Sequence, residues 1–404
     1  MESTSPDAIA ERLLACCLEG RPWSPEDLRR LVEKDSATLF RVVVEGLGDR
    51  FEPGLCDAYA RLFSEAIACA LPGVDAAELV ARYRRIRHSA RRVRNAATVF
   101  VLSRITLGAD VAVTSVLLDA AKRRFPRSRI VFAGPRKNWE LFAGDPRIEH
   151  LEVAYARRGS LAERLAPWSG MRATLDWPGS IVIDPDSRLT QLGLLPVCPD
   201  DNYFFFESRA FGGDGEEPVS ALASRWAAET LGVPGARPFV SPAAAPVTSD
   251  RPLICVSLGV GENPAKRIAD PFEEELLRAL AAKGPTVLVD QGAGGEETAR
   301  VLRAIKRSGA PAGRIRTWKG AFAPFAATIA QAALYVGYDS AAQHVAAACG
   351  VPLVTVFAGF VTPRFFARWR PSGPGPIRVI RVDDRDPARV LDETLRAIDT
   401  LGMG

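Results

Sequence analysis

The sequence contains few residues of the kinds that build disulfide frameworks and metal centres. Only 7 of its 404 residues are cysteine and 3 are histidine, and no two cysteines have Cys-x-x-Cys spacing. An odd number of cysteines without this spacing is typical of reduced thiols and argues against a zinc site. We therefore expect a cytoplasmic protein without a metal centre and without a cofactor.

Long apolar runs and a strong excess of one charge are also missing. No stretch of about 18 uncharged apolar residues occurs, so no membrane-spanning helix is predicted. The first residues lack a basic region followed by an apolar core, so we expect no signal peptide. The formal net charge of +4 is too small to indicate nucleic-acid binding by itself. With 47% hydrophobic residues, the chain is typical of a globular protein of two or three domains.

Positive charge is concentrated in one short segment. Residues 82–94 contain seven arginines, whereas residues 1–80 are acidic on balance. The simplest interpretation is the solvated face of a linker helix. The alternatives are contact with a phosphorylated acceptor or with an anionic membrane, which would place the protein on the inner face of the cell membrane. RNA is a weaker alternative because no RNA-binding motif is present, and we expect no nucleic-acid partner.

Hydrophobic patterns indicate a helical region followed by two α/β domains. Apolar residues at helical spacing predict an accessory helical region over residues 1–95. Short apolar runs then alternate with helical stretches over residues 96–240 and again over residues 241–385. This alternation is typical of βαβ units and parallel sheets. Strands are predicted at residues 98–102, 129–133, 180–184, 253–258, 286–290, 333–336 and 353–357.

Two further segments complete this organisation. Residues 232–251 are rich in proline and are interpreted as the interdomain linker. Residues 386–404 contain an amphipathic helix that we expect to pack back on the N-terminal α/β domain. The predicted fold class is therefore α/β, with two Rossmann-like domains facing a cleft. Ligands of such folds bind at the carboxyl ends of the strands.

The strongest chemical signal lies where the strand at 333–336 meets a helix predicted over 340–349. Residues of N-cap type and small residues there would leave the first backbone N–H groups open toward the cleft, and a histidine follows on the first turn. A helix N-terminus of this kind is an anion site suited to a diphosphate. The alternative is a capped helix with a core histidine. The residues concerned are Asp339, Ser340, Ala341, Ala342 and His344.

Two glycine-rich turns are further candidates for donor contacts. Gly259 and Gly261 follow a strand and lead to Lys266, as expected of a turn that brings a lysine to a phosphate. The spacing matches neither a Walker A loop nor a full dinucleotide fingerprint, so an ordinary turn is an equal alternative. The turn at 292–295 precedes Glu296, which is a candidate for a ribose hydroxyl or the ordinary acid of a helix start.

Candidates for the chemical step lie in the first α/β domain. Asp110 ends the loop after the strand at 98–102, where a carboxylate would take a proton from an acceptor hydroxyl. A helix N-cap is the alternative. Arg136 and Lys137 follow the next strand and are candidates for acidic groups of an acceptor. The stretch 184–186 imitates an Asp-x-Asp metal signature, but we assign no metal ligand to so short a pattern.

Together these motifs resemble glycosyltransferase family 9, the bacterial lipopolysaccharide heptosyltransferases of GT-B fold, over residues 97–401. Residues 339–344 match the family's D-[ST]-G-x-x-H, and Lys266 is similar to its phosphate-binding lysine. Asp110 is similar to the aspartate of its G-D-[VI] motif, and residues 188–195 to its R-x-x-Q-x-x-L-L stretch. Ala109 and Ala341 stand where the family has glycine, Ile268 stands where it commonly has tryptophan, and the helical region is no part of the family pattern.

The resemblance implies an inverting, metal-independent transfer of a heptose-like sugar. The donor would be a nucleotide diphosphate sugar, with ADP-heptose favoured, and the acceptor a hydroxyl of lipopolysaccharide or another cell-surface glycan or glycolipid. Asp110 would be the general base, with a pKa raised by desolvation. The N-terminus of the helix at 340–349, Lys266 and His344 would hold the diphosphate.

Two other functions remain open at this stage. A sugar-nucleotide epimerase could share the architecture, although it needs more acid and base residues than the pattern supplies. A catalytically degenerate protein that binds a nucleotide sugar or scaffolds an assembly is favoured by Ala109 and Ala341.

Overall fold

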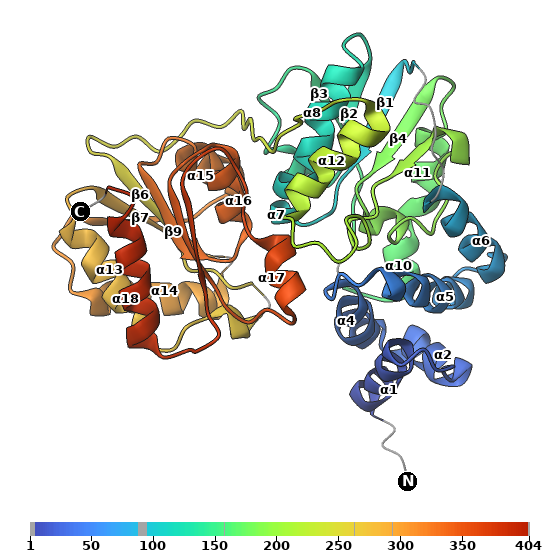
Figure 1. The fold of residues 1–404 in the computed structure, drawn as a ribbon, viewed down its shortest axis with the longest axis horizontal. Helices are drawn as coiled ribbons and strands as arrows, with labels where there is room; N and C mark the ends of the chain where they lie inside the picture. Colours follow the sequence, from blue (N-terminus) through green and yellow to red (C-terminus); the bar gives the residue numbers. More distant parts are fainter. Residues whose placement is uncertain (1–4, 88–94, 157, 262, 293, 403–404) are drawn as a thin grey trace.

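The N-terminal helical region and two α/β domains follow one another along the chain (Figure 1). The computed structural model describes residues 5–402 except 88–94, 157, 262 and 293. Each α/β domain is built on its own parallel sheet. The α/β architecture predicted from the sequence, with its helical N-terminal region, is confirmed.

The helical region begins at two capped helices and packs on the first α/β domain. The side chains of Ser5 and Ser24 accept hydrogen bonds from backbone amides of the helices that follow them, each of which starts with proline. Its apolar side chains share one core with those of the neighbouring domain, for example Phe63 with Val182. Its elements are α1 (Pro6–Leu18), α2 (Pro25–Lys34), α3 (Ser36–Thr38), the π-helical η1 (Leu39–Val44), α4 (Glu45–Gly48), α5 (Pro53–Ala70) and α6 (Ala76–Arg87).

The first sheet has five parallel strands in the order β3-β2-β1-β4-β5. Its strands are β1 (Thr98–Leu102), β2 (Arg129–Gly134), β3 (Ile148–Glu152), β4 (Ser180–Asp184) and β5 (Tyr203–Phe205). The helical elements of this domain are α7 (Leu107–Ala109), η2 (Asp110–Thr114), α8 (Ser115–Arg124), α9 (Arg136–Trp139), α10 (Leu161–Leu165), α11 (Pro167–Leu175), η3 (Arg188–Thr190), η4 (Asp200–Asn202) and α12 (Val219–Leu231).

The second sheet has six parallel strands in the order β11-β10-β9-β6-β7-β8. Its strands are β6 (Leu253–Ser257), β7 (Thr286–Asp290), β8 (Ile315–Trp318), β9 (Leu334–Tyr338), β10 (Leu353–Phe357) and β11 (Ile377–Arg381). Its helical elements are η5 (Pro264–Lys266), α13 (Phe272–Ala282), α14 (Gly295–Ser308), α15 (Phe322–Ile329), α16 (Ala341–Ala348), α17 (Pro363–Trp369) and α18 (Pro387–Asp399).

All seven strands predicted from the sequence occupy interior positions of the two sheets. The four strands that the sequence analysis missed, β3, β5, β8 and β11, are the edge strands. Interior strands of a parallel sheet are buried on both faces and therefore read as continuous apolar runs. Edge strands carry polar residues or are short, as β3 with its sequence Ile-Glu-His-Leu-Glu and the three-residue β5 illustrate.

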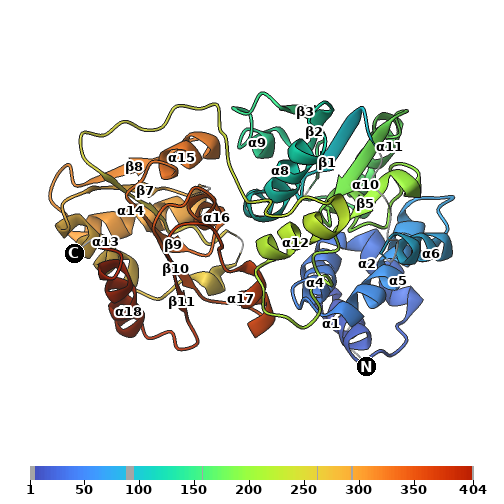
Figure 2. The same ribbon diagram turned by 45° about the horizontal axis from the view of Figure 1, so that its top comes forward.

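The C-terminal helix α18 packs on the second domain, which corrects our expectation that it returns to the first. It contacts α13 and strands β10 and β11, and Val390, Ala397 and Ile398 enter the core of the second sheet. Figure 2 shows α18 on the side of this domain that faces away from the first sheet. The amphipathic pattern indicated a buried face correctly, but α13 supplied the nearer apolar surface.

The two α/β domains meet at the carboxyl ends of their sheets. Helix α16 contacts α7 and η2, and Val111 of the first domain shares a core with Val345 of the second. The two backbones come close at Gly108, where a Cβ atom would lie 3.2 Å from the Cα of Ala341. No described helix is both long and apolar enough to cross a bilayer.

Candidate active site

Asp110 lies at this domain contact and is completely buried. Its carboxylate accepts four hydrogen bonds: from Ser103 Oγ at 2.6 Å, Arg104 N at 2.7 Å, Thr114 Oγ1 at 2.6 Å and Asn138 Nδ2 at 2.6 Å. Only one of these donors, Arg104 N, is a backbone amide, and it precedes Asp110 in the chain. The backbone amides that an N-cap residue binds follow it in the chain. Burial raises the pKa of Asp110, while the four donors oppose this shift.

Asn138, which the sequence analysis did not single out, donates a hydrogen bond to Asp110 from the segment that follows the neighbouring strand β2. It follows β2 on α9 and is completely buried, whereas the adjacent candidates Arg136 and Lys137 are exposed. Arg136 forms a 3.7 Å ion pair with Glu140. A polar residue after a strand that neighbours β1 was the available signal, because carboxyl ends of adjacent parallel strands lie side by side.

Lys266, on η5 after the glycine-rich turn at 259–261, reaches the N-terminal end of α16. Its Nζ lies 2.6 Å from Asp339 Oδ2 and 3.3 Å from the carbonyl oxygen of Asp339. Gln343, also missed in the sequence, donates to the other carboxylate oxygen of Asp339 and accepts from Thr355 at 2.7 Å. Lys266 and the start of α16 therefore lie together. An anion bound there could contact both the ammonium group of the lysine and the first backbone amides of the helix.

The first turn of α16 offers backbone donors. Ser340 occupies the N-cap position, but its side chain makes no capping hydrogen bond; its Oγ lies 3.3 Å from Tyr335 Oη. Ala341 is half-buried and Ala342 is buried. Because neither side chain is larger than a methyl group, the amides of this turn are suited to an anion placed beside Lys266.

His344 is buried between the two domains. A Cβ atom on Gly108 would lie 3.3 Å from its Cδ2, and its ring centroid lies 6.1 Å from that of Trp369. Burial lowers the pKa of His344 to about 4, although the negative charge of Asp339 partly opposes this shift. The imidazole is therefore neutral at pH 7, so it can hydrogen-bond a ligand but supplies no positive charge.

This shift predicts a loss of stability in acid that His344 causes. Between pH 6.5 and pH 4 the unfolded chain takes up a proton on His344 and the folded chain does not. At 1.36 kcal/mol per pKa unit, the free energy of unfolding should fall by about 3 kcal/mol over this range. The free energy of unfolding of wild type and His344→Gln can be measured by urea unfolding at several pH values. The decrease between pH 6.5 and pH 4 should be smaller in the variant by this amount. An equal decrease of the free energy of unfolding in both proteins would contradict the prediction.

The glycine-rich turn at 259–261 is bound by Glu297, the neighbour of Glu296, which the sequence analysis named as a candidate for a ribose hydroxyl. Glu297 Oε2 accepts from Val260 N at 2.9 Å and Gly261 N at 3.3 Å, and Gly259 packs beside its other oxygen. Glu296 is exposed. The two acids are adjacent at the start of α14, and the helical rotation between them decides which one faces the turn.

Buried acids outside this group have structural partners. Asp184 accepts from Ser187 N at 2.6 Å and from two hydroxyl groups, and Asp186 forms a buried ion pair with Arg209 at 2.9 Å. Within the described parts of the chain, no cluster of histidine, cysteine, aspartate and glutamate has the arrangement of a metal site.

The arginine-rich segment is partly internal. Arg82 is buried and pairs with Asp200 at 2.8 Å, and Arg87 pairs with Glu207 at 2.8 Å. Arg84 and Arg85 are exposed. The remaining three arginines, at 91, 92 and 94, lie outside the described residues.

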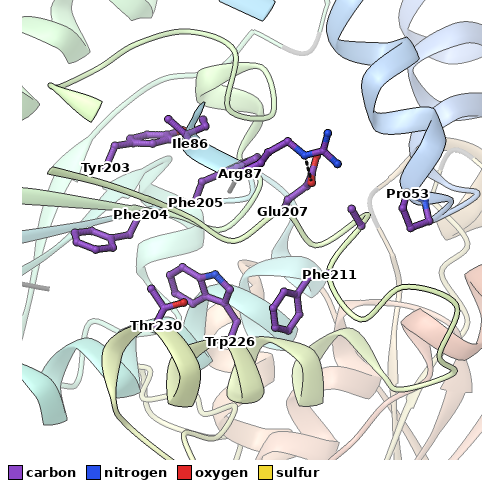
Figure 3. Close-up of a pocket in the computed structure, with 11 residues that line it drawn as sticks. Pro53, Ile86, Arg87, Tyr203, Phe204, Phe205, Glu207, Phe211, Trp226 and Thr230 are labelled. Carbon is purple, nitrogen blue, oxygen red and sulfur yellow. Dashed lines mark hydrogen bonds and ion pairs between the residues drawn. The ribbon is translucent and has the colours of Figure 1, made fainter. Parts of the chain in front are cut away.

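A separate cavity of about 380 Å³ lies between α6, β5 and α12. In Figure 3 the Arg87–Glu207 ion pair lies across this cavity from Trp226. Phe204 and Phe211 also line the cavity. None of the candidate donor or base residues lines it.

Two parallel α/β sheets that meet at their carboxyl ends form the GT-B fold. Residues 228–375 match the model of glycosyltransferase family 9 (heptosyltransferase). This match covers less than half of the chain, and it supports a glycosyltransferase.

Solved structures share the fold at low sequence identity. The family 9 glycosyl transferase of Veillonella parvula is 15% identical, with a TM-score of 0.57, over 78% of this chain and 99% of that one. Heptosyltransferase WaaC of E. coli, solved with ADP, is 16% identical, with a TM-score of 0.55, over 75% and 99%. ADP-heptose lps heptosyltransferase II of E. coli is 20% identical, with a TM-score of 0.51, over the same shares. No curated protein matches the chain significantly.

Proposed function

We propose that this protein is an inverting glycosyltransferase that transfers a heptose-like sugar from ADP-heptose to a hydroxyl of lipopolysaccharide or another cell-surface glycan. The observation that carries this proposal is the meeting of Asp110 with the Lys266–α16 group at one domain contact. The matching family is described as heptosyltransferase, and one structure that shares the fold was solved with ADP.

In this mechanism Asp110 takes the proton of the acceptor hydroxyl as its oxygen attacks the anomeric carbon of the sugar. The bond between that carbon and the diphosphate breaks, and ADP leaves from the opposite face, which inverts the configuration. Lys266 and the amides of α16 stabilise the charge that develops on the diphosphate, so the residues themselves supply the electrostatic role that a metal ion fills elsewhere.

The domains must separate to admit the sugar, because Gly108 and Ala341 are in contact. Interfaces between domains of one chain commonly permit such motion. Binding of the donor would also replace the Lys266–Asp339 ion pair by contacts between the lysine and the diphosphate.

The proposal is tested by incubating the purified full chain with ADP-heptose and lipopolysaccharide that lacks heptose, and following ADP release. We expect ADP and a product whose anomeric configuration, measured by NMR, is opposite to that of the donor. Binding of ADP-heptose without turnover would instead support a degenerate binding protein, and a changed sugar without ADP release would support an epimerase. A parallel panel of other nucleotide diphosphate sugars defines the donor.

A further inference from the structure

The loop between α4 and α5 carries the helical region into the contact between the two α/β domains. Phe51 is buried, and its ring centroid lies 6.4 Å from that of Phe365 and 6.1 Å from that of Trp369, both on α17. Arg364 Nη1 donates to the carbonyl oxygen of Phe51 at 3.1 Å. Figures 1 and 2 both show α4 next to α17. The loop is therefore anchored on the second domain, although α1–α6 pack mainly on the first.

Asp49, at the start of this loop, is a half-buried carboxylate without a partner. It accepts no hydrogen bond at its side chain and forms no ion pair among the residues that the structure describes. Burial and the nearby Glu45 raise its pKa to about 6, and the charges of Arg188, Lys266 and Arg104 oppose the shift. A carboxylate that feels nearby positive charges but accepts no hydrogen bond from them is suited to accept hydrogen bonds from a ligand.

Two of the three cations that act on the pKa of Asp49 belong to the two halves of the proposed reaction. Lys266 lies at the diphosphate side, on Asp339. Arg104 lies at the base side, since its amide donates to Asp110, and its guanidinium lies 5.8 Å from the ring of Trp369. The transferred sugar has to lie between the diphosphate and the base, and Phe51, two residues after Asp49, packs on the same Trp369 ring as Arg104.

Arg188 supplies a matching donor. Its Nη1 is buried and has no hydrogen-bond partner within the described residues. It follows β4 on η3, next to the β1 loop that carries Asp110. A buried guanidinium nitrogen left without an acceptor is costly unless a ligand satisfies it.

The loop also lines a cavity. A cavity of about 800 Å³ is lined by Arg50 and Glu52 of the loop, by Asp214 and Glu216 of the first domain, and by Arg364 of α17. The same loop thus contacts α17 of the second domain through Phe51 and lines this cavity through Arg50 and Glu52.

We propose that Asp49 and Arg188 bind the hydroxyl groups of the transferred sugar, so that the helical region completes the sugar-binding site. Asp49 accepts hydrogen bonds from the sugar hydroxyls and Arg188 donates to them. This inference rests on the proposed function, because it takes the ligand to be a nucleotide diphosphate sugar.

The test compares the affinities of ADP and ADP-heptose by calorimetry, using the full chain. In the wild type the sugar contacts should make ADP-heptose bind more tightly than ADP. Asp49→Ala should lower the ratio of the two affinities about 10- to 100-fold, as expected for the loss of hydrogen bonds to a charged group. Arg188→Met should lower it similarly, and Asp49→Asn, which keeps one acceptor oxygen, should fall between wild type and Asp49→Ala.

Asp57→Asn is the matched control. Asp57 is another carboxylate of the helical region, but it pairs with Arg87 at 2.7 Å, away from the domain contact. It should leave the affinity ratio unchanged. An unchanged ratio in Asp49→Ala would overturn the inference, as would an equal loss of affinity for ADP and ADP-heptose. Because the ratio is measured by binding alone, a failure of sugar transfer would contradict the proposed function and leave this measurement valid.

Discussion

Asp110→Asn is expected to lower the rate of sugar transfer about 10²- to 10⁴-fold while leaving ADP affinity within about threefold of wild type. The variant keeps the size of the side chain but removes its ability to take a proton. Single-turnover measurements of ADP release from ADP-heptose give the rate, and calorimetry gives the affinity. A rate near that of the wild type in a folded variant would exclude Asp110 as the general base.

The buried position of Asp110 requires a control for folding. Four donors surround its carboxylate, and an amide that presents an NH₂ group to them should lower the free energy of unfolding by about 1–3 kcal/mol. Asp184→Asn tests this cost separately, because Asp184 is also completely buried and also accepts several hydrogen bonds. It should lose comparable stability but retain its transfer rate per folded molecule.

The raised pKa of Asp110 also predicts the direction of the pH dependence. A general base acts only when it is deprotonated, so the rate should fall as the pH decreases through the pKa of Asp110. Because burial raises that pKa, the fall should occur at a higher pH than the ordinary aspartate value of 3.8.

Lys266→Ala is expected to weaken ADP binding about 10- to 100-fold, and it should weaken ADP-heptose binding equally. The variant removes the cation that we propose binds the diphosphate, and it leaves the carboxylate of Asp339 without its ion-pair partner. Hydrogen bonds to charged groups contribute about 1.5–3 kcal/mol, which corresponds to this range. Calorimetry with ADP alone measures the effect without dependence on the acceptor.

Lys283→Ala is the matched control for this variant. Lys283 belongs to the same domain and lies at the same 2.6 Å distance from a carboxylate, that of Asp399, but on the outer helix α18. Its loss should change ADP affinity less than twofold. Equal effects of the two variants would show that Lys266 acts through the general charge of the domain and not through contact with the diphosphate.

The candidate site was predictable where a residue type and its place in a βα unit determine its role. Asp110, Lys266 and Asp339 follow strands whose apolar runs are plain in the sequence, and the structure brings them to one domain contact. The partners that orient these residues were not predictable. Asn138 lies beside the exposed Arg136 and Lys137, and Glu297 beside the exposed Glu296. In both cases the helix directs one side chain inward and its sequence neighbour outward, and the residue types alone do not show which one points inward.

The two-sheet α/β architecture could be predicted from the residue pattern alone, because interior parallel strands need continuous apolar runs and the chain contains seven of them. The start of α16 could be predicted as well, since Asp339 and Ser340 are residues of N-cap type. The edge strands, the packing of α18 on α13, and the entry of Phe51 into the domain contact became known only from the three-dimensional structure. These features depend on surfaces supplied by distant parts of the chain, and no local pattern of residues encodes such a surface.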